Sequence, residues 1–454
     1  YTCKKLTGTQ YALSTDSDIY LYDVASGRTS NLTEGMPGYD KYPVFSPDDS
    51  MIAFTSMERP GNESDKDRLF VMSLADGSKR YLTEGFDYNA GNVRWADDST
   101  LLFLSPIRAT IQLCSVSLSG GPVRVITSGA HDLNAFSAAG GRVVAEMTTL
   151  GSPTELFDVN PSDGAMTRIT NTNAEIYERI RMGKVEERWV ETTDGKRMLV
   201  WVVLPPDFDP SKKYPALLYC QGGPQSVVSQ FWSYRWNLQL MAAQGYVVVA
   251  PNRRGLPSFG QEWLDQISGD YSGQNIRDYL SAIDDVSAEP WVDRDRLGCV
   301  GASYGGYSVF FLAGNHQKRF KAFIAHCGMF NFESMYGATE ELWFPNNDLG
   351  GPYWSDSPVA RRSYANSPHK FVKNWDTPIL IFSGQRDFRI PYTESLQAFT
   401  AARLMGVPSR LVSFEDEAHQ VFKPQNSLVW NREFFSWLDR YVKNAETPAE
   451  QTGR

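Results

Sequence analysis

Apolar and polar residues follow two different patterns in the two parts of this 454-residue chain. Up to about residue 175, short alternating runs are separated by clusters of Gly, Asp, Ser and Asn, which is typical of β-strands joined by tight turns. From about residue 188, continuous apolar runs alternate with segments of helical periodicity. The first pattern predicts an all-β region, and the second predicts a doubly wound α/β sheet.

The first region contains an internal repeat. Strand-like runs begin at Asp18, Asp67, Thr110 and Thr154, so that successive starts lie 49, 43 and 44 residues apart. Each run is followed, after a short turn, by an apolar residue and a threonine. Short strands at this period are typical of propeller blades, and a sandwich with accidental similarity is the alternative interpretation.

About four blades fit into residues 1–175, and the segment 1–13 resembles the middle of a blade. A second signature, Asp-Asp-Ser before an apolar run, occurs at 48–54 and 97–103, as equivalent turns of successive blades would. We therefore expect a partial, truncated β-propeller in which the chain begins partway through a larger one. A complete four-bladed propeller is the alternative.

The second region is expected to span 188–443, after a charged linker at 176–187 and before a polar tail at 444–454. Its predicted strands are 199–204, 216–220, 246–250, 297–300, 322–325, 379–382 and 409–414. Its predicted helices are 232–243, 274–287, 307–315, 394–405 and 428–442. In such a sheet, the loops at the carboxyl ends of the strands meet at one edge and carry the binding site.

Composition narrows the partners that the chain can have. A net charge of −9 at pH 7 argues against nucleic acid or an anionic membrane as the main partner. No uncharged run approaches the length of a membrane span. The cysteines, which are too scattered for a disulfide framework or a zinc site, are Cys3, Cys114, Cys220, Cys299 and Cys327. We expect no metal and no cofactor, and the sequence leaves a homodimer open.

The chain begins at Tyr1 and not at a methionine, which suggests a processed or truncated product with a lost leader. We therefore expect a periplasmic or secreted protein, with a cytoplasmic location as the alternative.

Candidate chemistry centres on Ser303 in the stretch Gly-Ala-Ser-Tyr-Gly-Gly-Tyr at 301–307. An apolar run precedes this stretch and a helical segment follows it, which is the context of a nucleophile elbow. The glycines allow a sharp turn that places the serine hydroxyl above the edge of the sheet. The motif alone is weak, so the assignment depends on whether the chain supplies partners for the serine.

Two residues fit as partners, in the order Ser, acid, His that α/β-hydrolases use. Asp387 follows the strand 379–382, and His419 follows the strand 409–414, so both are expected at the edge that carries Ser303. A serine nucleophile needs such a base, and the base needs a carboxylate to fix its tautomer. The alternatives are His369 as base, which no predicted strand precedes, and Asp416 or Glu417 as acid, which precede His419 too closely to reach behind its ring.

An oxyanion hole needs backbone N–H groups aimed at the developing negative charge. The N–H of Tyr304, at the start of the helix after the elbow, is one candidate donor. The loop Gln221-Gly222-Gly223-Pro224 follows a predicted strand and supplies the second, for which we select the N–H of Gly223.

Taken together, these residues resemble the prolyl oligopeptidase family of serine peptidases. The resemblance covers essentially the whole chain and rests on the repeats, on the elbow, on Asn-Arg-Arg-Gly at 252–255, on Gly-x-x-Asp-x-Arg-Ile-Pro at 384–391 and on the final histidine loop. The stretches 221–224 and 339–345 are most similar to the branch of dipeptidyl-peptidase V and acylaminoacyl-peptidase. Two departures are Ala418, where relatives usually have glycine, and the lack of a tyrosine in the oxyanion loop.

The resemblance implies roles for further residues. Arg389 would bind the substrate carbonyl one residue upstream of the scissile residue, and Phe332, Tyr336 and Ile390, together with Tyr304, would line an apolar specificity pocket. It implies a propeller that restricts access to short peptides, and a serine exopeptidase that releases dipeptides. Acylaminoacyl release or oligopeptidase activity is the first alternative. A carboxylesterase or a binding propeller attached to a degenerate hydrolase is less expected.

Overall fold

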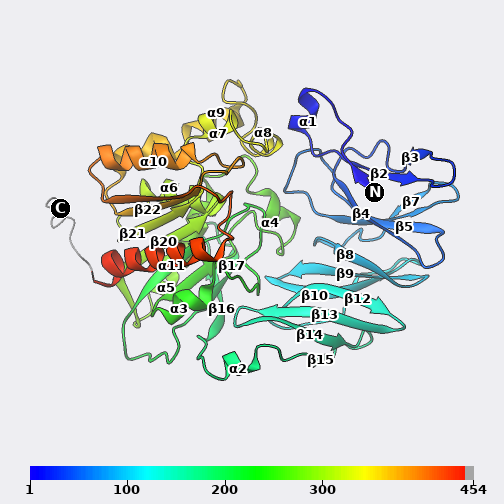
Figure 1. Ribbon diagram of the computed structural model, residues 1–454, viewed down its shortest axis with the longest axis horizontal. Helices are drawn as coiled ribbons and strands as arrows, with labels where there is room; N and C mark the ends of the chain where they lie inside the picture. The colour runs from blue at the N-terminus through cyan, green and yellow to red at the C-terminus, as the bar shows by residue number, and fades with distance from the viewer. Residues whose placement is uncertain (445–454) are drawn as a thin grey trace. The chain divides into compact units, whose positions relative to one another are not determined.

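The computed structural model describes residues 1–444 (Figure 1), and the rest of the expected polar tail lies outside the described residues. The chain divides into two units. The first, here called the blade unit, comprises Tyr1–Arg179, Ser229–Trp232 and Pro257–Asp265. The second, called the α/β unit, comprises Ile180–Val228, Ser233–Leu256 and the residues from Gln266 onward.

The blade unit consists of antiparallel strands in groups that follow the sequence repeat. The first group has three strands and each of the next three has four, the last two groups being joined by a short parallel bridge between β10 and β12. The strands are β1 (Thr2–Cys3), β2 (Asp18–Tyr22), β3 (Thr29–Asn31), β4 (Asp40–Phe45), β5 (Met51–Ser56), β6 (Arg68–Ser73), β7 (Lys79–Tyr81), β8 (Gly91–Asp97), β9 (Thr100–Ile107), β10 (Thr110–Ser117), β11 (Arg124–Val125), β12 (Asp132–Ala139), β13 (Arg142–Thr149), β14 (Ser152–Val159) and β15 (Met166–Arg168). Two short helices, α1 (Thr9–Leu13) and α2 (Ala174–Tyr177), complete the unit's first 179 residues.

The repeated threonine has the same task in every blade. Its hydroxyl accepts a hydrogen bond from a backbone N–H of the strand that precedes the last strand of the blade. The four pairs are Thr33 with Ile19 at 2.9 Å, Thr83 with Leu69 at 3.0 Å, Thr127 with Leu113 at 2.9 Å and Thr170 with Leu156 at 2.8 Å. The threonine thus satisfies a donor that the last strand of the blade leaves unpaired, which explains why it recurs at the blade period.

Two segments from later in the chain belong to the blade unit because their polar groups pair there. Asp132 accepts hydrogen bonds from the Ser229 hydroxyl at 2.5 Å and from the Gln230 N–H at 3.1 Å. Ser258 accepts the Ala109 N–H on its hydroxyl at 2.7 Å. The expected boundaries assigned both segments to the second region, because the apolar pattern does not reveal such long-range pairs. α4 (Gln261–Asp265) lies in the second of these segments.

The α/β unit is built on one eight-stranded sheet of order β16-β17-β19-β18-β20-β21-β22-β23. The first three strands pair antiparallel and the remaining pairs are parallel. The strands are β16 (Val185–Glu191), β17 (Arg197–Val203), β18 (Tyr214–Cys220), β19 (Val247–Pro251), β20 (Val292–Ala302), β21 (Ala322–His326), β22 (Ile379–Gly384) and β23 (Ser409–Phe414). The helices are α3 (Leu238–Ala243), α5 (Gln274–Ser287), α6 (Tyr304–Ala313), α7 (Phe332–Tyr336), α8 (Trp343–Asp348), α9 (Pro358–Ala365), α10 (Thr393–Leu404) and α11 (Pro424–Leu438). A 3-10 turn (Pro368–Asn374) precedes β22, and a short π-helix (Asp439–Lys443) extends α11.

All seven predicted strands of this region exist, but two expectations were wrong. The helix predicted at 232–243 begins only at Leu238, because the Ser233 hydroxyl accepts the N–H groups of Arg235 and Trp236 and holds the preceding segment in a turn. The expected linker ends in strand, since β16 starts at Val185. This edge strand, Val-Glu-Glu-Arg-Trp-Val-Glu, is rich in charged residues and buries only Val190, so it lacks the continuous apolar run of a buried strand.

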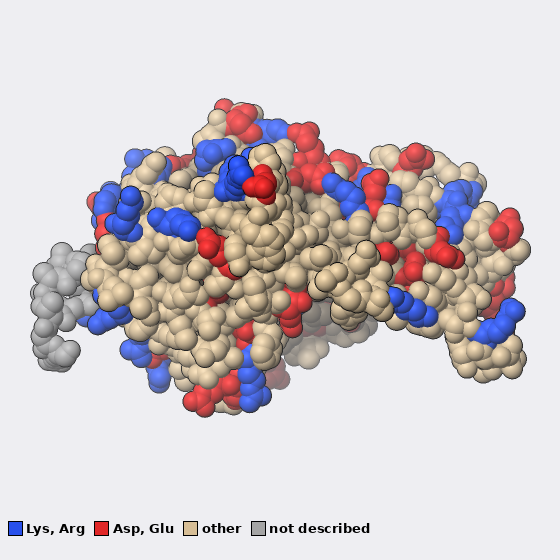
Figure 2. Space-filling model, turned by 90° about the horizontal axis from the view of Figure 1, so that it is seen from above, with Lys and Arg blue, Asp and Glu red and all other residues tan. Residues whose placement is uncertain are grey.

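Lysine and arginine are interspersed with aspartate and glutamate over the face of the molecule shown in Figure 2. Within residues 1–444, no helix has the length and apolar composition needed to cross a bilayer; the longest, α11, has 15 residues, against about 20 for a span.

Candidate active site

Ser303 sits on a sharp turn between β20 and α6. Its backbone has φ 60° and ψ −125°, a conformation that side chains rarely adopt. The turn is held by the Ser303 N–H, which donates to the His326 carbonyl at 2.9 Å. A Cβ at Gly305 would lie 2.0 Å from the Cys220 carbonyl oxygen, so this position requires glycine. The sequence therefore forms the predicted elbow, with the serine at the carboxyl end of β20.

The structure brings Asp387 and His419 to this serine. The His419 Nε2 lies 3.0 Å from the Ser303 Oγ, and the His419 Nδ1 lies 2.7 Å from the Asp387 Oδ2. The second carboxylate oxygen of Asp387 accepts the backbone N–H groups of Arg389 and Ile390 at 3.0 and 2.9 Å. These bonds fix the carboxylate, which in turn holds the imidazole with Nδ1 protonated and Nε2 toward the serine.

The electrostatic environment of His419 favours its charged form. Burial opposes protonation of the ring, but the Cys327 sulfur and the Asp387 carboxylate beside it outweigh this effect and raise the pKa of His419. The Asp387 carboxylate thereby stabilises the imidazolium that forms when the ring accepts the proton of an attacking hydroxyl.

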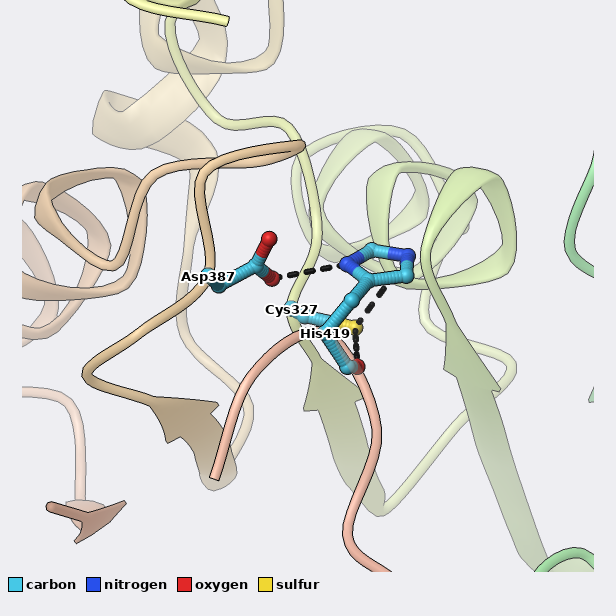
Figure 3. Close-up of side chains that lie close together, drawn as sticks. All are labelled: Cys327, Asp387 and His419. Atoms are coloured by element: carbon cyan, nitrogen blue, oxygen red, sulfur yellow. Dashed lines mark hydrogen bonds and ion pairs between the residues drawn. The ribbon is translucent and has the colours of Figure 1, made fainter. Parts of the chain in front are cut away.

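Cys327 is the neighbour that the sequence pattern did not single out. Its Sγ lies 4.0 Å from the His419 Nε2 and 3.3 Å from the His419 carbonyl oxygen (Figure 3). The residue follows β21 directly and has a φ of 42°. Its position at the carboxyl end of a parallel strand is the signal that would have placed it at the site.

The candidate oxyanion loop approaches the elbow closely. A Cβ added to Gly222 would lie 3.5 Å from the Ser303 Cβ, and Gly223 has a φ of 112°. Arg253, fully buried, supports the loop because its guanidinium donates to the Pro224 carbonyl at 3.2 Å. That guanidinium also lies 4.5 Å from the centre of the Tyr304 ring and so links the loop to the elbow. The buried arginine of the Asn-Arg-Arg-Gly motif therefore has a positioning task.

The alternative acids and base have other partners. Asp416 pairs with Lys423 and accepts the Asn426 amide at 2.9 Å. Glu417 accepts the N–H groups of Phe422 and Lys423 and so closes the loop that follows His419. The Nδ1 of His369 lies 2.8 Å from the Ser367 hydroxyl.

The residues expected in the specificity pocket divide between two aromatic clusters. Phe332 is buried and contacts the rings of Tyr271 and Tyr307, with centroids 6.3 and 5.3 Å apart. Tyr304 joins this cluster through Tyr271, at 4.9 Å, and its hydroxyl donates to Asn275. The second cluster surrounds Tyr336, which lies one turn after Phe332 on the same helix, α7.

Tyr336 contacts the rings of Tyr353 and Trp354 and donates its hydroxyl to the Asn346 side chain at 3.0 Å. Ile390 is buried next to Asp387, to which it gives its N–H. The assignment of these residues to a pocket stays a prediction.

Comparison with known proteins agrees with this arrangement. The model of the prolyl oligopeptidase family (peptidase S9) matches residues 232–445. The chain is 55% identical to dipeptidyl-peptidase 5 of Porphyromonas gingivalis and 50% identical to that of Porphyromonas endodontalis, in both cases over 98% of its length. Over residues 232–445, the chain belongs to the prolyl oligopeptidase family. It spans 65% and 64% of the lengths of these two relatives.

Solved structures show the same fold. An acylaminoacyl peptidase of Pyrococcus horikoshii superposes with a TM-score of 0.84 at 23% identity, over 96% of this chain and 68% of that one. The predicted fold class, an α/β-hydrolase domain preceded by a partial β-propeller, is confirmed.

Arg389, the residue to which the family resemblance assigns a substrate carbonyl, is held by acidic neighbours. Its guanidinium lies 2.7 Å from a Glu341 carboxylate oxygen and 3.9 Å from one of Glu340. Burial raises the pKa of Glu341, against the effect of the Arg389 charge. The Arg389 side chain is 47% exposed, so it is accessible from solvent while this ion pair orients its guanidinium.

Proposed function

We propose that this member of the prolyl oligopeptidase family is a serine peptidase that releases dipeptides from the N-termini of short peptides. The observation that carries the proposal is the continuous hydrogen-bonded series from Ser303 through His419 to Asp387 on a strained elbow. This geometry performs nucleophilic acyl transfer.

In the proposed mechanism, the Ser303 Oγ attacks the carbonyl carbon of the scissile peptide bond while His419 Nε2 accepts the hydroxyl proton. The carbonyl oxygen becomes negatively charged and is stabilised by the N–H groups of Tyr304 and Gly223. His419 then donates its proton to the leaving amine, and the acyl-enzyme forms. Water, activated by the same imidazole, hydrolyses this ester and restores Ser303.

The preference for dipeptides is supported by the two relatives at 50% identity or above, both called dipeptidyl-peptidase 5. The acylaminoacyl peptidase is only 23% identical to this chain, and this similarity supports the fold but not the substrate preference. The acidic residues beside Arg389 also favour a substrate with a free N-terminus. A free N-terminal ammonium would be attracted to the carboxylates of Glu340 and Glu341 beside Arg389, and an acylated terminus would not.

The test compares a dipeptide chromogenic substrate that has a free amine with its N-acetylated form and with the matching ester. We expect the free-amine substrate to give the largest kcat/KM, and the Ser303→Ala variant to turn over none of the three. Faster cleavage of the acetylated form would favour acylaminoacyl release. Ester turnover without amide turnover would favour a carboxylesterase.

A further inference from the structure

Three side chains able to bind a metal meet at the candidate active site. Ligand atoms of Cys327, Asp387 and His419 all lie within 4.8 Å of one another. They come from the loops after β21, β22 and β23, and Figure 3 shows the carboxylate and the thiol both directed toward the histidine. Peptide hydrolysis by serine attack uses no thiol, so the proposed mechanism leaves Cys327 without a task.

The distances fit a thiophilic cation bridging Cys327 and His419. In a tetrahedral zinc site, Zn–S is about 2.3 Å and Zn–N about 2.0–2.1 Å, which places sulfur and nitrogen about 3.6 Å apart. The Cys327 Sγ and the His419 Nε2 are 4.0 Å apart, so a change of a few tenths of an ångström suffices. The Ser303 hydroxyl, 3.0 Å from the same nitrogen, and water are available for the remaining positions.

Asp387 completes the arrangement without touching the ion. Its bond to the His419 Nδ1 keeps that nitrogen protonated and leaves Nε2 as the donor atom. A histidine held by a carboxylate in this way is the usual arrangement behind a zinc-bound imidazole. The same contact that prepares His419 to accept a proton therefore prepares it to coordinate a metal.

The other cysteines of the α/β unit lack this context. Cys220 and Cys299 are fully buried and contact one another, with their sulfurs 3.7 Å apart. His419 is reachable, since 14% of its side chain is exposed. Cys327 itself is 1% exposed, so a cation would reach its sulfur past the partly exposed His419 beside it.

We propose that Cys327 and His419 form an inhibitory binding site for thiophilic divalent cations such as Zn²⁺. On binding, the Cys327 thiol releases its proton to solvent and its thiolate donates an electron pair to the cation. The His419 ring likewise releases to solvent any proton held on Nε2 and donates that nitrogen's lone pair, so no oxidant or reductant takes part. The nitrogen that would accept the Ser303 proton is then occupied, and acyl transfer stops. The inhibitory effect rests on the proposed function; the binding does not.

Binding is tested with Co²⁺ and Zn²⁺ on purified protein, using the thiolate-to-cobalt charge-transfer absorption and competition against a zinc indicator dye. We expect one cation per chain, an absorption band in the wild type and in Ser303→Ala, and no band in Cys327→Ser. Loss of a carboxylate behind a ligating histidine costs about 10–100-fold in metal affinity, so Asp387→Asn should weaken Zn²⁺ binding by that factor and Cys327→Ser by more. The matched control, Cys299→Ser, should bind Zn²⁺ like the wild type.

Inhibition is tested on peptide hydrolysis, with each variant compared with its own rate in the presence of a chelator. We expect Zn²⁺ to inhibit the wild type and Cys299→Ser reversibly and in competition with substrate, and Cys327→Ser to need at least about tenfold more Zn²⁺. Equal inhibition of the wild type and Cys327→Ser, or a charge-transfer band that persists in Cys327→Ser, would overturn the proposal. A protein that binds Co²⁺ through Cys327 but hydrolyses no peptide would instead contradict the proposed function and leave the metal site standing.

Discussion

At the scale of single residues, the backbone of Ser303 carries strain that only its chemistry explains. A non-glycine residue at φ 60° and ψ −125° costs about 1–3 kcal/mol, and such strain collects at functional sites. The neighbouring contacts, notably the close approach of Gly305 to the Cys220 carbonyl, hold the backbone of the turn in this conformation.

Ser303→Gly should therefore raise the free energy of unfolding by about 1 kcal/mol while abolishing hydrolysis, because glycine adopts this conformation without a steric cost. The measurement is urea denaturation of both proteins under the same conditions. Ser308→Gly, inside α6, is the control and should lower the free energy of unfolding by about 1 kcal/mol. A destabilised Ser303→Gly would show that the elbow is not strained.

Glu341 is the residue on which the preference for a free N-terminus is expected to depend. Glu341→Gln should raise KM for the free-amine dipeptide substrate by about tenfold, because one ion pair at a partly exposed site contributes about 1 kcal/mol or somewhat more. The rate on the N-acetylated form should change little. An equal loss on both substrates would mean that Glu341 acts only by orienting Arg389.

At the scale of elements, the apolar pattern predicted the inner strands of the α/β unit well because they are buried on both faces. β21 and β22, for example, are buried along their whole lengths. The short helices α7, α8 and α9 were not predicted, since their segments are held by long-range contacts such as Tyr336 with Asn346 and Tyr364 with the Gly351 carbonyl.

The catalytic residues of the candidate site were also predicted, because the strands that they follow were predicted. Ser303, Asp387 and His419 each follow a strand that the pattern reveals, so strand ends and chain order suffice to group them. Cys327 also follows such a strand, but its side chain reaches His419 because the backbone has a φ of 42°. The pattern of apolar and polar residues does not predict that backbone angle. Glu341 reaches Arg389 from a loop 48 residues earlier in the chain.

The blade threonines give a prediction about the elements of the first unit. Thr127→Val should destabilise the protein by about 1–3 kcal/mol, because it leaves the N–H of the fully buried Leu113 without an acceptor. Thr170→Val is the matched variant in the last blade, where Leu156 is 37% exposed and water can replace the hydroxyl. Its effect on the free energy of unfolding should be clearly smaller, and equal losses would contradict this account.

The loop after β19 is fixed by a buried ion pair whose removal should depend on pH. The Arg254 side chain and the Asp278 carboxylate are fully buried, with Nε 3.2 Å from a carboxylate oxygen. Arg254→Met leaves that carboxylate uncompensated, which should cost about 3–5 kcal/mol near pH 8. Burial already raises the pKa of Asp278 in the wild type, and loss of the guanidinium raises it further.

The sign of this pH effect follows from linkage. A carboxyl group whose folded-state pKa exceeds its unfolded value lowers stability above the folded pKa, and the penalty disappears as pH falls. Arg254 also holds the pKa of Asp194 below its ordinary value, but that favourable contribution is lost only below about pH 4 and stays constant between pH 8 and pH 5. The difference between wild type and Arg254→Met should therefore shrink from about pH 8 to about pH 5, as urea denaturation at both values would show. A constant difference would contradict it.

At the scale of the whole molecule, the chain combines a blade unit with an α/β unit that contains all three members of the hydrogen-bonded series. The two loop segments 229–232 and 257–265 leave the α/β sequence to join the blade unit. This chain spans about two thirds of the length of its Porphyromonas relatives. The peptidase activity of these 454 residues is therefore to be measured on this chain itself.

The central claim, that Ser303 forms an acyl-enzyme with the help of His419, is tested most directly by a fluorophosphonate probe and mass measurement of the labelled peptide. We predict one label per chain on Ser303, none in Ser303→Ala, and a rate of labelling reduced by several orders of magnitude in His419→Ala. Labelling at another residue, or labelling of Ser303→Ala equal to that of the wild type, would contradict the claim.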